Sequence, residues 1–254
     1  MTPKVHILAT CKNPELLPMT TLVFKTLRTG FPSADVDVHV NGMRLQEVTT
    51  LIREADSAGV RFVAGARDVH HHDWVRHLVE TEKEPFWICD TDMVFYDSVE
   101  KFTIQPSFLM SGRHIPSFRE EWTGLRHAER LHTCLLYLNP VEVCRFARDF
   151  RKHFPPGFPG DPALNLIRQN VQFRAGYETV FFDTCAGLYH ACINYAHEFN
   201  EVENSAFAHL NCGTYSDKVE LSVQLARRHR DVLNNPEEGR KFLAEERAYH
   251  KILA

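Results

Sequence analysis

This sequence of 254 residues lacks paired cysteines, a long apolar run and an excess of positive charge. Its seven cysteines stand singly, without a Cys-x-x-Cys pair, so they give no sign of a structural zinc site and fit a reducing compartment. No stretch approaches the roughly 20 apolar residues of a membrane span, and the short apolar run at residues 5–9 is no signal-peptide core. A formal net charge of −4 argues against nucleic acid as a partner. We therefore expect a soluble cytoplasmic protein without stable membrane insertion.

The first hundred residues alternate short apolar runs with helical patterns. Strands are predicted at residues 5–9, 36–40, 60–64 and 85–89, and helices at 14–27, 45–55 and 72–82. Strands and helices that alternate at this spacing predict an α/β fold with a mixed, mostly parallel sheet flanked by helices. The rest of the chain reads as an α+β half. Its predicted parts are strands at 107–111 and 133–138, a loop at 112–122, a helix at 141–151, a Pro/Gly-rich loop at 154–162, and helices at 163–169 and near the C-terminus.

The strongest chemical signal is Asp90-Thr91-Asp92, directly after the apolar run at residues 85–89. Ligands of parallel α/β sheets gather at the carboxyl ends of strands, where two carboxylates at this spacing can aim at one point. Hard oxygen ligands suit Mg²⁺ or Mn²⁺ carrying a diphosphate, and the imidazole of His209 would complete the set for Mn²⁺. The alternative is that the two acids only cap a turn or helix.

The segment around this motif and several other segments resemble glycosyltransferases of the GT-A fold. More narrowly, they resemble the retaining group that includes glycogenin and the lipopolysaccharide galactosyltransferases. Residues 86–99, FWICDTDMVFYDSV, are similar to that group's apolar strand, DxD, second strand and Asp-Ser helix start. Residues 133–140 resemble its next strand, 160–165 (GDPALN) its DQDALN segment, and 209–218 its C-terminal His…Gly…Lys stretch. The segments follow one another in the family's order.

The resemblance implies one GT-A domain over residues 1–254. Residues 1–100 would form the nucleotide-binding half, 101–220 the acceptor half and 221–254 C-terminal helices. It implies a metal-dependent hexosyltransferase that moves a sugar from a nucleotide-diphosphate sugar, with a UDP-sugar favoured, to an acceptor hydroxyl on a saccharide, with retention favoured. Asp90, Asp92 and His209 would hold Mn²⁺ or Mg²⁺, while Arg76 and Lys218 would reach the donor phosphates.

Other polar residues are candidates by their position in the predicted fold. Ala9, Thr10 and Lys12 follow the first strand and Asn41 ends the second, where a nucleoside approaches such a sheet. Asp161 would orient the acceptor or face the positive charge at the sugar carbon, with Asn165 on the same helical face. Asp161 would equally serve as a helix cap. If the enzyme inverts instead, Asp183 is the best candidate for the base that deprotonates the acceptor.

Three other functions compete with this interpretation. Asp90 and Asp92 also fit a haloacid-dehalogenase-like phosphatase, in which the first Asp attacks phosphate and Mg²⁺ assists. His70-His71-His72-Asp73 with a distant His suggests a 2-His-1-carboxylate iron site, although that site normally lies on the strands of a jelly roll. A degenerate, non-catalytic nucleotide-sugar-binding protein would also keep the fold. The sequence leaves the oligomeric state open.

Overall fold

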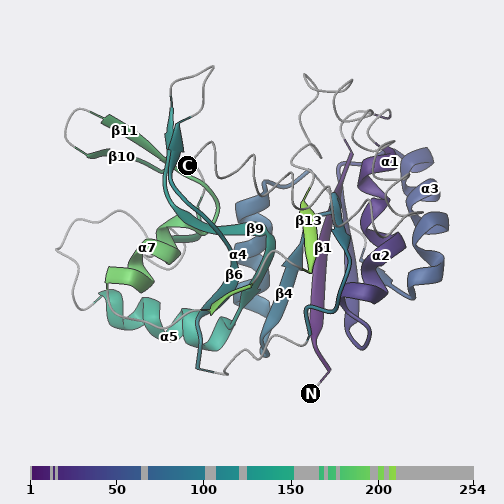
Figure 1. The fold of residues 1–254 in the computed structure, drawn as a ribbon, viewed down its shortest axis with the longest axis horizontal. Helices are drawn as coiled ribbons and strands as arrows, with labels where there is room; N and C mark the ends of the chain where they lie inside the picture. Colours follow the sequence, from purple (N-terminus) through teal and green to yellow (C-terminus); the bar gives the residue numbers. More distant parts are fainter. Residues whose placement is uncertain are drawn as a thin grey trace. The chain divides into compact units, whose positions relative to one another are not determined.

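The computed structural model of the chain, whose helices and strands are drawn in Figure 1, falls into two compact units. The first comprises Met1–Asp68, Cys89–Phe102 and Glu203–Ala254, and the second comprises Val69–Ile88 and Thr103–Val202. Within these, the structure describes residues 2–11, 14, 17–63, 68–100, 107–119, 125–151, 166–168, 171–175, 178–194, 200–202 and 206–209. The expected single domain and its internal boundaries stay predictions.

Three parallel strands with helices form the body of the first unit. β1 (Lys4–Thr10) pairs with β2 (Asp35–Asn41), and β2 pairs with β3 (Arg61–Val63), both in parallel. Val5, Ile7 and Val38 are completely buried, as expected for the strands of a parallel sheet. The predicted strands at 5–9, 36–40 and 60–64 are thereby confirmed, although β3 is shorter than expected.

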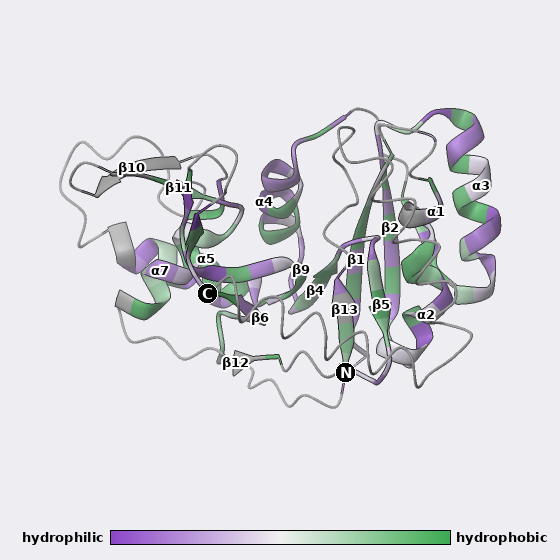
Figure 2. Cartoon of the chain, turned by 45° about the horizontal axis from the view of Figure 1, so that its top comes forward, coloured by the Kyte–Doolittle hydropathy of each residue, from purple (hydrophilic) through white to green (hydrophobic). Residues whose placement is uncertain are grey.

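Helices α1 (Leu17–Thr20), α2 (Leu22–Gly30) and α3 (Leu45–Ala55) belong to the same unit, with a 3-10 turn at Asp56–Ala58. The expected helix at 14–27 is interrupted at Thr21 and runs on to Gly30. The helix at 45–55 is confirmed, and Figure 2 shows hydrophilic and hydrophobic residues alternating around it. Its buried side chains are Glu47, Leu51 and Ala55, whereas Leu45 and Ile52 are exposed.

A two-stranded sheet completes the first unit: β5 (Met93–Phe95) pairs antiparallel with β13 (Phe207–His209). Helix α2 packs closely on β5, because a Cβ at Gly30 would lie 2.4–2.9 Å from ring atoms of Phe95. Only glycine allows this approach. Thr26 Oγ1 accepts a hydrogen bond from Phe95 N at 3.0 Å, and Thr91 O accepts one from Val23 N at 3.1 Å. The chain around Asp90-Thr91-Asp92 is therefore anchored to α2.

The second unit contains α4 (His71–Thr81) and a mixed set of strands. β6 (Met110–Ile115) pairs antiparallel with β9 (Arg130–Leu138) and parallel with β12 (Asn200–Glu201). A smaller sheet has the order β10 (Val171–Ala175), β11 (Glu178–Phe182), β8 (Arg126–His127) and β7 (Phe118–Arg119). Helices α5 (Pro140–Arg151) and α7 (Ala186–Asn194) complete the unit, and β4 (Phe86–Cys89) leads from it into the first.

The predicted α/β class with parallel and antiparallel strands is confirmed. The predicted helices at 72–82 and 141–151 are also confirmed, with ends that differ by at most one residue from those of α4 and α5. The predicted strand at 133–138 is part of β9. The loop expected at 112–122 is wrong in part, because residues 112–115 continue β6 and Phe118–Arg119 forms β7. The longer strand is explained by its partner, since β9 begins at Arg130 and supplies hydrogen bonds as far as Ile115. Among the described helices, none is long and apolar enough for a membrane crossing.

Candidate metal centre

The two carboxylates of Asp90-Thr91-Asp92 sit in a turn between two buried strands. All four residues of β4 and all three of β5 are buried, so the chain on both sides of the turn is held in the core. Asp92 is itself buried, with 4% of its surface exposed, whereas the side chain of Asp90 is 30% exposed. The turn thus presents one buried and one accessible carboxylate.

Strand pairing brings His209 to these carboxylates. In the β5–β13 register, His209 lies opposite Met93, the neighbour of Asp92. The Nε2 atom of His209 lies 3.2 Å from Oδ1 of Asp92 and 3.6 Å from Oδ2 of Asp90. The pairing continues beyond β5, where Ala206 O accepts hydrogen bonds from Tyr96 N at 2.8 Å and Asp97 N at 3.2 Å. Residues that are more than a hundred positions apart therefore form one group.

The geometry of this group fits a divalent cation. One ligand atom from each of Asp90, Asp92 and His209 lies within 4.8 Å of the others. Neighbouring ligands of an octahedral ion lie about 3 Å apart, because each is about 2.1 Å from the ion. The separations of 3.2 and 3.6 Å are close to that spacing. Two carboxylates with one imidazole suit Mn²⁺, and the carboxylates also suit Mg²⁺. The accessible Asp90 leaves a side on which further ligands can bind.

Of the predicted nucleoside-binding residues, Thr10 and Asn41 lie together at the ends of β1 and β2. They are partners in the parallel register, and Asn41 Nδ2 donates a hydrogen bond to Thr10 Oγ1 at 3.1 Å. Both are buried, and Ala9 is completely buried, so Ala9 can offer a ligand only its backbone. Gly42 follows with φ +63°, a left-handed conformation that lets the chain turn directly after Asn41.

Two predicted residues lie in the second unit, each within an ion pair. Arg76 on α4 lies 3.4 Å from Asp73 and 4.0 Å from Glu80. Asp183 follows β11; its Oδ2 lies 2.9 Å from Nη2 of Arg130, and its Oδ1 accepts a hydrogen bond from Thr184 N at 2.8 Å. Lys12, Asp161, Asn165 and Lys218 lie outside the described residues. In the described part of the chain, His70–Asp73 does not appear among the groups with metal-ligand geometry, so the iron site has no support.

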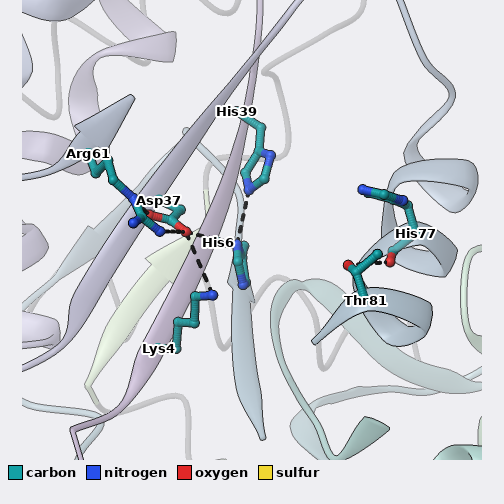
Figure 3. A network of polar contacts seen from close by, with 7 residues as sticks. All are labelled: Lys4, His6, Asp37, His39, Arg61, His77 and Thr81. Atoms are coloured by element: carbon teal, nitrogen blue, oxygen red, sulfur yellow. Dashed lines mark hydrogen bonds and ion pairs between the residues drawn. The ribbon is translucent and has the colours of Figure 1, made fainter. Parts of the chain in front are cut away.

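A second polar cluster in the first unit was not foreseen from the sequence. His6, Asp37 and His39 lie on one face of the parallel strands, and Figure 3 shows Lys4 and Arg61 converging on Asp37. Arg61 donates two hydrogen bonds of 2.6 Å to the carboxylate, Lys4 Nζ lies 3.8 Å away, and His6 Nδ1 lies 3.0 Å from His39 Nε2. The only available signal was the polar residue at every second position of two predicted strands.

Electrostatics separate this cluster from the metal centre. Burial, followed by the charges of His39 and Lys4, lowers the pKa of His6 to about 3. Burial would raise the pKa of Asp37, but the hydrogen bonds and charge of Arg61, with His6 and Lys4, hold it below its usual value. Although the ligand spacing here also suits a metal ion, two cations already neutralise Asp37. We interpret the cluster as a charge network around the buried Asp37 and a neutral, buried His6.

No protein-family profile and no curated protein matches the chain. Its fold resembles solved glycosyltransferases. One is the mannosyltransferase PcManGT from Pyrobaculum calidifontis in complex with GDP-Man and Mn²⁺, at 12% identity and TM-score 0.39 over 72% of this chain and 57% of that chain. Another is the galactosyltransferase LgtC in complex with donor and acceptor sugar analogs, at 12% identity and TM-score 0.42 over 89% of this chain and 95% of that chain.

A further similar structure is not a glycosyltransferase. It is a 4-diphosphocytidyl-2C-methyl-D-erythritol synthase from Anaerococcus prevotii DSM 20548, at 8% identity and TM-score 0.44 over 89% of this chain and 96% of that chain. The chain spans 32%, 46% and 42% of the length of the first three matched chains, all of them glycosyltransferases.

Proposed function

We propose that this protein is a metal-dependent glycosyltransferase that moves a hexose from a nucleoside-diphosphate sugar to a hydroxyl of a saccharide. Asp90, Asp92 and His209 would hold Mn²⁺ or Mg²⁺, and a UDP-sugar is the favoured donor. The observation that carries the proposal is the position of His209 Nε2, 3.2 and 3.6 Å from the two carboxylates of a strand-end Asp-x-Asp. The sequence resemblance supplies the reaction, and the cytoplasm is the expected compartment.

In this proposal the chain contributes a fixed set of metal ligands and, at the ends of β1 and β2, polar groups that bind the nucleoside. The bound ion would supply positive charge against the leaving diphosphate. Asp92 and His209 are buried and are positioned by the β5–β13 register, so little ordering is needed when the site forms. Thr10 and Asn41, which already hydrogen-bond to each other, would present polar groups to the nucleoside. The predicted roles of Arg76 and Lys218 toward phosphate belong to the same proposal.

The stereochemistry and the proton acceptor are also part of the proposal. Retention is favoured, with Asp161 and Asn165 acting near the sugar carbon. If the reaction inverts, Asp183 would serve as the base, and the Arg130 pair would hold its carboxylate in place. A product analysis by NMR of the anomeric configuration separates these two routes.

The test is a calorimetric and thermal-shift comparison of UDP, GDP, CDP and dTDP, each with Mn²⁺ or with EDTA. A ligand at 100 times its dissociation constant stabilises the fold by about 2.7 kcal/mol. We expect one nucleotide to give a metal-dependent shift that Asp92→Asn abolishes. Asp35→Asn, which removes an exposed carboxylate at the start of β2, serves as the matched control and should leave the shift intact.

Binding alone would also be given by a non-catalytic nucleotide-sugar binder, so turnover decides between the two. Release of the nucleotide from a nucleotide sugar, dependent on an added saccharide, supports the transferase. Metal-dependent binding without turnover for any sugar tested would favour the binder. Hydrolysis of phosphate esters in place of nucleotide binding would favour the phosphatase.

A further inference from the structure

Asp68 is an exposed aspartate of the first unit that follows β3 in the chain, and its side chain packs against Gly42. A Cβ at Gly42 would lie 3.2 Å from both Cβ and Cγ of Asp68 and 3.3 Å from its Oδ1. Because Gly42 has no side chain and adopts φ +63°, the carboxyl group of Asp68 can lie directly against the backbone that follows β2.

This contact places Asp68 at the edge of the sheet where β1 and β2 end. Thr10 and Asn41 are the last residues of these two strands, and Asn41 is the chain neighbour of Gly42. The strand order is β1, β2, β3, so the three strands are neighbours in one parallel sheet. Their ends bring a hydroxyl, an amide and a carboxylate to the edge at which ligands of parallel α/β sheets bind.

The carboxylate differs from the other two groups in its exposure. Thr10 and Asn41 are buried and hydrogen-bond to each other, whereas Asp68 is exposed to an incoming ligand. An ionised carboxylate only accepts hydrogen bonds, and its two oxygens can accept from two groups at once. Asp68 is therefore suited to a ligand with adjacent donors.

Within a ribonucleoside diphosphate, the ribose best provides such donors. Its 2′- and 3′-hydroxyls are adjacent, whereas the phosphates carry negative charge that a carboxylate repels. In dinucleotide-binding α/β folds, an acidic residue of the sheet's binding edge accepts the hydrogen bond of the ribose 2′-hydroxyl. Asp68 has the chemistry and the place in the sheet for the same contact.

We propose that Asp68 binds the ribose hydroxyls of the nucleotide and makes the site selective for ribonucleotides over 2′-deoxyribonucleotides. This inference rests on the proposed function and narrows its donor class. Sugars carried by UDP, GDP or CDP satisfy the contact, whereas a dTDP-sugar lacks the 2′-hydroxyl and is excluded.

The experiment compares matched nucleotides by calorimetry with Mn²⁺ present: UDP with 2′-deoxy-UDP, GDP with 2′-deoxy-GDP, and CDP with 2′-deoxy-CDP. We expect the wild type to bind one ribonucleotide at least about tenfold more tightly than its deoxy partner, because a hydrogen bond to a charged group is lost. Asp68→Ala should bind that ribonucleotide about tenfold more weakly and the deoxy partner within about twofold of the wild type. The ratio of the two affinities should therefore fall to near one.

The ratio separates a contact with ribose from a structural role of the side chain. Asp35→Ala, which removes an exposed carboxylate at the opposite end of β2, is the matched control and should keep the wild-type ratio. Equal weakening of both nucleotides in Asp68→Ala would overturn the proposal, because the side chain would then shape the site or bind the base. Equal affinity of the wild type for both nucleotides would overturn it as well, and in both cases the metal-dependent binding of the proposed function would stand. If no nucleotide bound with Mn²⁺, the proposed function itself would be refuted, and this inference with it.

Discussion

Neutral His6 makes stability depend on pH in a calculable way. Burial lowers the pKa of His6 from 6.5 to about 3 in the folded protein, whereas the unfolded chain keeps the ordinary value. The folded state therefore binds the proton more weakly than the unfolded state. The stability that this difference provides is fully present above the unfolded pKa and is lost as the pH falls from 6.5 toward 3.

The size of the effect follows from the two pKa values. Between pH 7 and pH 5 the unfolded chain takes up most of one proton at this site and the folded protein takes up almost none, which costs about 2 kcal/mol of unfolding free energy. Asp37 does not contribute in this window, because its pKa is held below the ordinary 3.8. His71, whose pKa burial lowers to about 4, adds a loss of stability in the same window, so the contribution of His6 is the difference between the wild type and a variant without its imidazole.

The assay is urea unfolding followed by circular dichroism at pH 7, 6 and 5, with EDTA to remove metal ions. Between pH 7 and pH 5, the unfolding free energy of His6→Gln should fall by about 2 kcal/mol less than that of the wild type. This difference is expected whatever the stability of the variant at pH 7. His77→Gln, which replaces an exposed histidine of α4, is the control and should keep the wild-type slope. An unchanged slope in His6→Gln would refute the interpretation of His6 as a buried neutral residue.

Two substitutions test the packing and the ion pairs. Gly30→Ala should lower the unfolding free energy by about 1–3 kcal/mol, because its Cβ would lie 2.4–2.9 Å from the ring of Phe95. Urea unfolding measures this loss, and Thr29→Ala, at an exposed position of α2, is the control. Equal losses of unfolding free energy in the two variants would contradict the close packing of α2 on β5. Asp183→Asn should cost about 2 kcal/mol or more, because it leaves the buried Arg130 without its carboxylate. The same measurement on Asp183→Asn with Arg130→Met should recover most of that loss if the ion pair is its cause.

Local sequence patterns were sufficient for most of the elements. The apolar residues of β4 and the 3.6-residue periodicity of 45–55 are short-range signals, so the strand and the helix are found where predicted. The division of 14–27 into two helices at Thr21 was missed, because neither proline nor glycine stands at Thr21 itself and Pro18 lies within α1. The continuation of β6 through residues 112–115 was missed for another reason: a strand's length depends on the partner that receives its hydrogen bonds.

By itself, the sequence determined that two carboxylates would follow a buried strand, since an apolar run and its polar end are adjacent in the chain. Ligand chemistry allowed His209 as a third partner, but no local pattern singled it out among fifteen histidines. The β5–β13 register decided that this imidazole lies 3.2 Å from Asp92. The same holds for His6, Asp37 and Arg61, which lie on three different strands. Which charged side chains come together is decided by strand register, because pairing joins residues whose separation along the chain carries no local pattern.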